Sequence, residues 1–232
     1  MSQYSALGAE PVGLRESRGH RRRRRRAPRV FGFAILALGL IIVSIVGVKL
    51  LRGAVARERA RTEWTKVMKS SSISSLAGLS LTRVAAGAPV VRVIIPTIRL
   101  DEVVVEGLSD KDLWAGPGHM PGTVFPGEPG NSVISAHRDR HFHRLDEVRV
   151  GDVLETQTPT MSVRWRVTLR RVVGKDERAI FESSQPTLTL TTCWPTRYVG
   201  SAPDRLVLTA EPVSMRERAK ASTTVQPSAE SH

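Results

Sequence analysis

The chain has 232 residues, of which 41% are hydrophobic, and a formal net charge of +13. This length and composition suit one packed domain with additional segments. Most of the excess charge lies in residues 1–61, which hold 14 Lys or Arg and 3 Asp or Glu. The rest of the chain is nearly neutral, which argues against nucleic-acid binding, because a nucleic-acid-binding module carries its basic side chains on the folded domain.

The N-terminal region predicts a membrane anchor. Residues 1–29 are Arg-rich and have no apolar period, so we expect a disordered cytoplasmic tail close to anionic lipid head groups. Residues 30–51 include an uncharged run from Val30 to Val48 that is long enough to cross a bilayer as a helix. The Arg cluster before this run predicts a cytoplasmic N-terminus and an extracytoplasmic domain in a single-pass cell-membrane protein. A cleaved signal peptide is the alternative, since Ala54-Val55-Ala56 resembles a cleavage site, but signal peptides have shorter apolar regions.

Residues 52–88 predict a stalk helix followed by a linker. The helix is indicated by apolar residues that recur at helical spacing, namely Ala56, Ala60, Trp64, Val67 and Met68. The linker is indicated by the Ser and Gly residues of 70–88. We therefore expect the stalk helix to pack on the domain and the linker to tether it.

Residues 89–211 have the pattern of many short strands. In 163–170, apolar residues at odd positions alternate with Arg and Thr at even positions, as in a strand with one wet face. Further runs lie at 90–95, 101–106, 132–136, 152–157, 187–193 and 205–210. This pattern predicts an all-β domain, either a closed barrel or a sandwich, and the polar residues 212–232 predict a disordered tail.

Cys193 is the single cysteine of the chain, so no intrachain disulfide can form. A lone thiol outside the cell is a small buried hydrophobe, a site of intermolecular pairing or a nucleophile. Cys193 ends a predicted strand, which Pro195 stops directly afterwards. His137 ends another strand and Arg205 begins the last one, so adjacent strands would bring a base, a nucleophile and a fixed cation together.

Three segments make the sequence resemble the sortase family. Residues 189–193, Thr-Leu-Thr-Thr-Cys, match the T-L-x-T-C signature of sortases, and residues 130–139 resemble their histidine segment. Arg205, within 202–206, stands where the family arginine belongs, and the resemblance extends over 90–211. Residues 198–203 are most similar to class D or class E sortases.

The resemblance implies a fold and an activity. The fold is an eight-stranded closed β-barrel, preceded along the chain by one transmembrane helix and a short stalk helix. The activity is that of a cysteine transpeptidase, with hydrolysis as a side reaction and no cofactor. Cys193, with His137 and Arg205, would cleave the LPxTG-like sorting signal of a secreted protein after Thr and form a thioacyl enzyme. An amine of a cell-wall precursor or a pilin lysine would then attack the thioacyl enzyme and release the product. Candidate substrate-binding residues are Thr189, Thr192, Trp194, Tyr198 and His119.

Other interpretations compete with this one. His137, His141 and His143 form an H-x3-H-x-H pattern, but without a second cysteine we do not expect a metal site. Other wall-active cysteine enzymes, such as L,D-transpeptidases and NlpC/P60 peptidases, carry their cysteine in sequence contexts that differ from this one. A catalytically silent adhesion or scaffold module would instead have a buried, unreactive Cys193.

Overall fold

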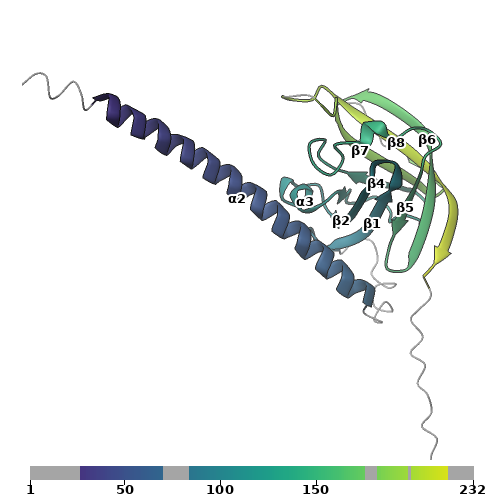
Figure 1. Cartoon of the computed structure of the whole chain (residues 1–232). Coiled ribbons are helices and arrows are strands. Elements are labelled where there is room, and N and C mark those ends of the chain that lie inside the picture. The colour runs from purple at the N-terminus through teal and green to yellow at the C-terminus, as the bar shows by residue number, and fades with distance from the viewer. Residues whose placement is uncertain (1–26, 70–83, 176–181, 198–199, 219–232) are drawn as a thin grey trace, which may run out of the picture. The chain divides into compact units, whose positions relative to one another are not determined.

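The structure is a computed structural model that describes residues 27–69, 84–175, 182–197 and 200–218. The described chain begins with a long helix, and eight strands follow that close a barrel (Figure 1). By its internal contacts the chain divides into two units, Met1–Leu50 and Leu51–His232. Nearly all of the predicted N-terminal tail, and most of the predicted linker and C-terminal tail, lie outside the described residues.

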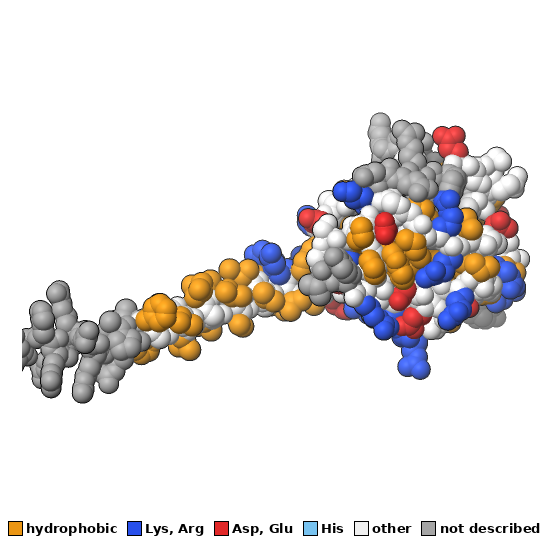
Figure 2. All heavy atoms as spheres, turned by 90° about the horizontal axis from the view of Figure 1, so that it is seen from above, with side chains coloured by type: hydrophobic (Ala, Val, Ile, Leu, Met, Phe, Trp, Pro, Cys, Tyr) orange, Lys and Arg blue, Asp and Glu red, His pale blue; other side chains and the backbone are white. Residues whose placement is uncertain are grey.

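Helix α2, Ala27–Lys69, is uninterrupted over 43 residues. Its part from Phe31 onward is long and apolar enough to cross a membrane, and its most apolar window has a mean hydropathy of 2.7. Side chains 31–51 are exposed, and Figure 2 shows the hydrophobic ones along this stretch. The structure joins the predicted anchor and stalk into one helix, because α2 has no proline after Pro28 and an isolated glycine such as Gly53 costs only about 1 kcal/mol.

The barrel confirms the predicted eight-stranded closed fold. Its strands are β1 Pro89–Ile95, β2 Leu100–Glu106, β3 Gly118–His119, β4 Asn131–Ser135, β5 Val153–Gln157, β6 Met161–Gly174, β7 Thr187–Trp194 and β8 Asp204–Glu217. Around the barrel they follow the order β1-β2-β3-β4-β7-β8-β6-β5, and β5 pairs with β1 to close it. Three short helices connect them, η2 Pro96–Ile98, α3 Asp110–Ala115 and η3 Leu145–Glu147.

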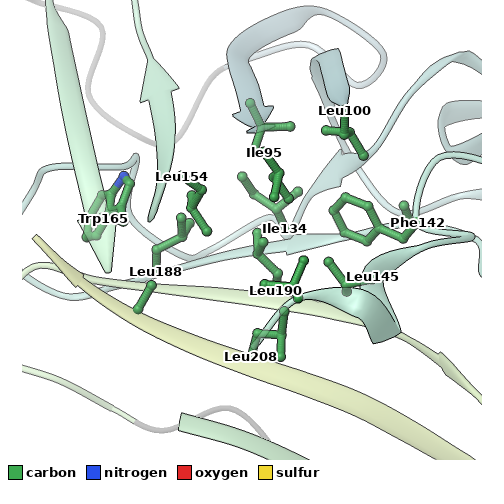
Figure 3. Packing of buried hydrophobic residues seen from close by; sticks show 14 of the residues in the cluster. Ile95, Leu100, Ile134, Phe142, Leu145, Leu154, Trp165, Leu188, Leu190 and Leu208 are labelled. Atoms are coloured by element: carbon green, nitrogen blue, oxygen red, sulfur yellow. The ribbon is translucent and has the colours of Figure 1, made fainter. Parts of the chain in front are cut away.

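Inward-facing strand residues build one core inside the barrel (Figure 3). The predicted alternation in β6 is confirmed over 163–167, because the odd residues are buried while Arg164 and Arg166 are exposed. It is wrong at Leu169, which is exposed and lies just past a shift in the pairing register with β8. Trp165 is fully buried, and its indole Nε1 donates a hydrogen bond of 2.7 Å to Thr156 Oγ1. A large apolar side chain buried in this way stabilises the fold by roughly 1.5–3 kcal/mol.

Two parts of the sheet differ from the sequence prediction. Strand β3 has two residues, pairs parallel with β2 and antiparallel with β4, and is too short to produce a hydrophobic period. Strand β8 continues to Glu217 rather than ending near residue 211, because Pro212–Glu217 pair with the first half of β6. The predicted C-terminal tail therefore begins after this strand.

The second half of α2 packs on the outside of β2. Ala60 and Trp64 are each 6% exposed and form a cluster with Val103 and Val105, and Met68 packs against it. These helix residues belong to the apolar face that the sequence predicts for the stalk. Burial of this face holds the helix from Gly53 onward against the barrel.

Candidate active site

The parallel pairing of β4 and β7 brings His137 and Cys193 to the same end of the sheet. Ser135 lies opposite Thr191, so His137 and Cys193 each follow two residues after a paired position. The pairing continues past β4, since the Ala136 amide donates to the Thr191 carbonyl at 3.2 Å. Both His137 and Cys193 are half-buried, as suits groups that a substrate must reach.

The antiparallel pairing of β7 and β8 places Arg205 directly opposite Cys193. Arg205 Nη1 lies 3.7 Å from Cys193 Sγ. The strand adjacency that would bring Arg205 to Cys193 is thus present in the structure. A guanidinium here supplies fixed positive charge next to the sulfur and next to any oxyanion that forms beside it.

A side-chain hydrogen bond links the residues that precede His137 and Cys193. Thr192 is 2% exposed, and its Oγ1 donates to the Ala136 carbonyl at 2.7 Å. The candidate base, His137, directly follows Ala136, and the candidate nucleophile, Cys193, directly follows Thr192. The bond therefore fixes the relative position of the two strand ends.

A tight turn follows His137 and is anchored in the core. The His137 carbonyl accepts hydrogen bonds from the amides of Arg140, at 3.3 Å, and Phe142, at 3.2 Å. Phe142 is fully buried among the core residues. The backbone on both sides of His137 is therefore held, by β7 before it and by the core after it.

Arg138 bridges two loops at this end of the barrel, although the sequence-based prediction gives it no role. Its Nη1 donates to the Pro195 carbonyl at 3.0 Å, and its Nη2 donates to the Gly200 carbonyl. The loop after Cys193 is thereby tied to the segment that carries His137. Its place directly after the candidate histidine is the signal that could have identified it.

The remaining predicted site residues differ in their exposure. Thr189 and Thr192 are buried and donate hydrogen bonds to Asn131 Oδ1 and to the Ala136 carbonyl. Trp194 is half-buried and lies 5.7 Å from the Arg170 guanidinium, measured from its ring centroid. Tyr198 lies outside the described residues.

His119 is buried in a polar cluster. It is 1% exposed, and its Nδ1 lies 2.7 Å from Glu106 Oε2. Its Nε2 lies 3.0 Å from the Val124 carbonyl, and its ring stacks on Phe125 with centroids 4.9 Å apart. All of these partners of His119 belong to the domain itself. A contact of His119 with substrate stays a prediction, as it does for Thr189 and Thr192.

His141 and His143 of the H-x3-H-x-H pattern face different partners. His141 Nδ1 lies 3.7 Å from Glu102 Oε1, and His143 Nδ1 lies 2.6 Å from the Arg140 carbonyl. Within residues 27–69, 84–175, 182–197 and 200–218, no three His, Cys, Asp or Glu side chains gather closely enough to hold a metal ion. The described residues thus offer acid-base and nucleophilic groups at the strand ends.

The sequence is similar to that of known proteins from one family. The family model for the sortase domain matches residues 93–213. Sortase D of Bacillus subtilis is 35% identical over 116 residues, which is 49% of this chain and 59% of that protein. The chain therefore spans less than two thirds of the length of that relative.

Solved structures share the fold. A Clostridium perfringens sortase D5 transpeptidase superposes with a TM-score of 0.60 at 22% identity, covering 68% of this chain and 99% of that one. The catalytic domain of B. anthracis SrtD gives a TM-score of 0.50 at 28% identity, covering 60% of this chain and 97% of that one. The family model alone covers more than half of the chain. The chain therefore belongs to the sortase family, whose members are cysteine transpeptidases.

Proposed function

We propose that this chain is a membrane-anchored sortase that cleaves an LPxTG-like sorting signal after Thr and transfers the acyl part to an amine. Cys193 is the nucleophile, His137 the proton carrier and Arg205 the cation that faces the oxyanion. The observation that carries the proposal is the Arg205–Cys193 pairing at 3.7 Å, at the strand end where His137 also lies. A thiol needs a nearby cation or base to act as a nucleophile, and the site offers both.

The reaction has two steps. The Cys193 thiolate attacks the carbonyl carbon of the Thr-Gly bond, and the Arg205 guanidinium stabilises the charge that develops on the oxygen. The C–N bond then breaks, and protonated His137 gives its proton to the leaving Gly amine. An acceptor amine next attacks the thioester, His137 takes a proton from it, and the C–S bond breaks to release the new amide and the thiolate. Attack by water instead of an amine gives the hydrolytic side reaction.

One helix among the described residues could cross a membrane, and we place the catalytic domain on its extracytoplasmic side. We assign residues 1–29 to a cytoplasmic tail, 30–51 to the membrane span and 52–88 to the stalk and linker. The catalytic domain then begins at residue 89 and extends beyond 211 to the end of β8 at Glu217. The Arg cluster before the span supports this topology, because Arg and Lys resist translocation.

The partners follow from the proposed chemistry. The acyl donors are secreted proteins with a C-terminal sorting signal, and the acceptor is an amine of a cell-wall precursor or of a pilin. Trp194 follows the nucleophile directly and Tyr198 comes five residues after it in the sequence, and we assign both to substrate binding. The identity with Sortase D of Bacillus subtilis favours class D over class E.

Intact-mass measurement tests this function. The full chain in a mild detergent is incubated with a panel of sorting-signal peptides, with and without a small amine. We expect a peptide thioester on Cys193, absent in Cys193→Ala, and an amide product that contains the added amine. A Cys193 that forms no adduct and also resists a small alkylating reagent would refute the proposal and favour a silent scaffold.

A further inference from the structure

We propose that the domain-facing part of α2 is a positioning element for the catalytic histidine, acting on the turn that follows His137. The contact is made by Arg57 of α2, Glu102 of β2 and His141 of the turn, which we call the Glu102 bridge. This inference rests on the proposed function, because it assigns a role to a surface that supports that site. It makes catalysis dependent on the docking of a membrane-anchored helix.

One face of α2 meets the barrel. Gly53, Arg57, Ala60, Arg61 and Trp64 follow the i, i+4, i+7, i+8 and i+11 spacing of a single helical face. Ala60 and Trp64 form the apolar part of the contact, and the two arginines lie beside it. An ion pair beside the apolar contact restricts the position of the helix along the barrel more than apolar packing alone, because the guanidinium must meet the carboxylate.

In the Glu102 bridge the Glu102 and His141 side chains are buried, whereas the Arg57 side chain is 43% exposed. The Glu102 side chain is 8% exposed and accepts two hydrogen bonds from the Arg57 guanidinium, through Nε at 3.0 Å and through Nη2. Arg61 Nη2 and His141 Nδ1 each lie 3.7 Å from the carboxylate, as electrostatic neighbours. Burial raises the pKa of Glu102, but His141 and Arg57 outweigh it and hold the pKa below its ordinary value. The carboxylate therefore stays ionised while it joins the helix to the turn.

A second contact touches the adjacent residue of the same turn. The Arg140 guanidinium lies over the Trp114 ring at 3.4 Å from the centroid. Gly53 of α2 is buried against this pair, since a Cβ there would lie 3.1 Å from Trp114 Cε3 and 3.4 Å from Arg140 Nη1. A residue with a Cβ at position 53 would therefore require Trp114 or Arg140 to shift.

The two contacts act on the same short segment. Arg140 and His141 are consecutive, and the amides of Arg140 and Phe142 donate to the His137 carbonyl. The turn is thus held on one side by the core and on the other by α2. Undocking the helix would free the buried carboxylate and the Arg140–Trp114 pair together, and it would loosen the backbone that positions His137 relative to Cys193. Small displacements of a catalytic group are costly, because proton transfer requires close approach.

The test uses the full chain in a mild detergent and removes one cation at a time. Arg57→Ala breaks the Glu102 bridge, whereas Arg59→Ala removes the same charge from an exposed site of the same helix. We expect Arg57→Ala to lower kcat for thioester formation about ten-fold with KM little changed, because the histidine is displaced while the substrate cleft remains. Arg57→Lys should restore part of kcat, since it keeps the positive charge.

Hydrogen exchange gives a readout that does not depend on activity. In Arg57→Ala, the amides of Arg140 and Phe142 should exchange faster, while the strands of the barrel keep their protection. Gly53→Ala, which crowds Trp114, should have a similar effect, and Gly47→Ala, with nothing within 4 Å of its Cβ, should have none.

The outcomes separate the two proposals. Unchanged exchange in the turn, or faster exchange with unchanged kcat, would overturn the positioning role and leave the sortase activity standing. Faster exchange in a chain whose wild type forms no thioester would sink the proposed function but not the coupling between α2 and the turn. Equal loss of kcat in Arg57→Ala and Arg59→Ala would also contradict the inference, because it would be an effect of net charge.

Discussion

Thr192→Val removes the hydrogen bond that joins the two strand ends of the site. Thr192 Oγ1 donates to the Ala136 carbonyl at 2.7 Å, and the side chain is 2% exposed. Valine has nearly the same shape, so the change leaves the packing intact and deprives a buried carbonyl of its side-chain donor. We expect the free energy of unfolding to fall by about 1–3 kcal/mol, the usual cost of a buried unsatisfied polar group.

The same change should also affect catalysis. The bond joins the residues immediately before His137 and Cys193, so its loss allows the two strand ends to shift relative to each other. We expect kcat for thioester formation to fall about ten-fold, because proton transfer between the two groups depends on their separation. Alkylation of Cys193 by a small neutral reagent should still go to completion, since the thiol remains accessible.

Thr191→Val is the matched control. Thr191 Oγ1 is buried and has no hydrogen-bond partner among the described residues. Removing it should leave the free energy of unfolding unchanged within about 0.5 kcal/mol, or raise it. Urea denaturation of the full chain in detergent, followed by near-UV circular dichroism, measures both variants. Equal stability of the two, or greater loss in Thr191→Val, would refute the reasoning.

Three further predictions concern the cation, the sheet and the helix contact. Arg205→Lys should lose most of the turnover, roughly 100-fold, while Cys193 still alkylates, because a planar fork becomes a point charge; unchanged kinetics would remove Arg205 from the mechanism. Gly118→Ala should destabilise the barrel by several kcal/mol in thermal unfolding, since its Cβ would lie 2.1 Å from the Gly107 carbonyl oxygen; a stability like that of wild type would contradict this close approach. Burial raises the pKa of Glu102, but His141 and Arg57 outweigh it and hold the pKa below its ordinary 4.5. The ionised Glu102 therefore stabilises the docked helix above pH 4.5, and this stabilisation is lost as the pH falls through the lower folded-state pKa. Tryptophan fluorescence from pH 7 to 3 should show this acid transition, and its persistence unchanged in Glu102→Gln would assign it to another group.

The sequence was most informative where side chains repeat with a period. The alternation of residues 163–170 predicts one wet and one buried face, and the structure confirms it over 163–167 of β6 but not at Leu169, which is exposed. A two-residue strand such as β3 has no period, so only its hydrogen bonds to β2 and β4 reveal it. The sequence did not predict the end of β8 for a different reason. Its apolar residues Val213 and Met215 remain exposed, and backbone pairing with β6 rather than burial makes it a strand.

For α2 too, the sequence predicted the apolar contacts with the barrel but not the ionic one. Ala60, Trp64 and Met68 lie on the apolar face that the spacing predicts. The ion pair between Arg57 and Glu102 joins residues 45 positions apart, and a charged side chain on a helix is by default expected to face water. Local sequence carries no information on which distant carboxylate an arginine will meet.

For the candidate site, the sequence by itself determined the chemical groups and their places along the chain: a lone thiol at a strand end, a histidine at another strand end, and an arginine at the start of the last strand. It also determined that an apolar helix precedes them, because length and hydropathy are local properties. Only the tertiary structure decided that β4 and β7 run parallel and that β7 and β8 run antiparallel, so that His137, Cys193 and Arg205 gather at one end of the sheet. The physical reason is that strand pairing depends on backbone hydrogen bonds between distant segments and on closure of a shared core, neither of which a local pattern of side chains specifies.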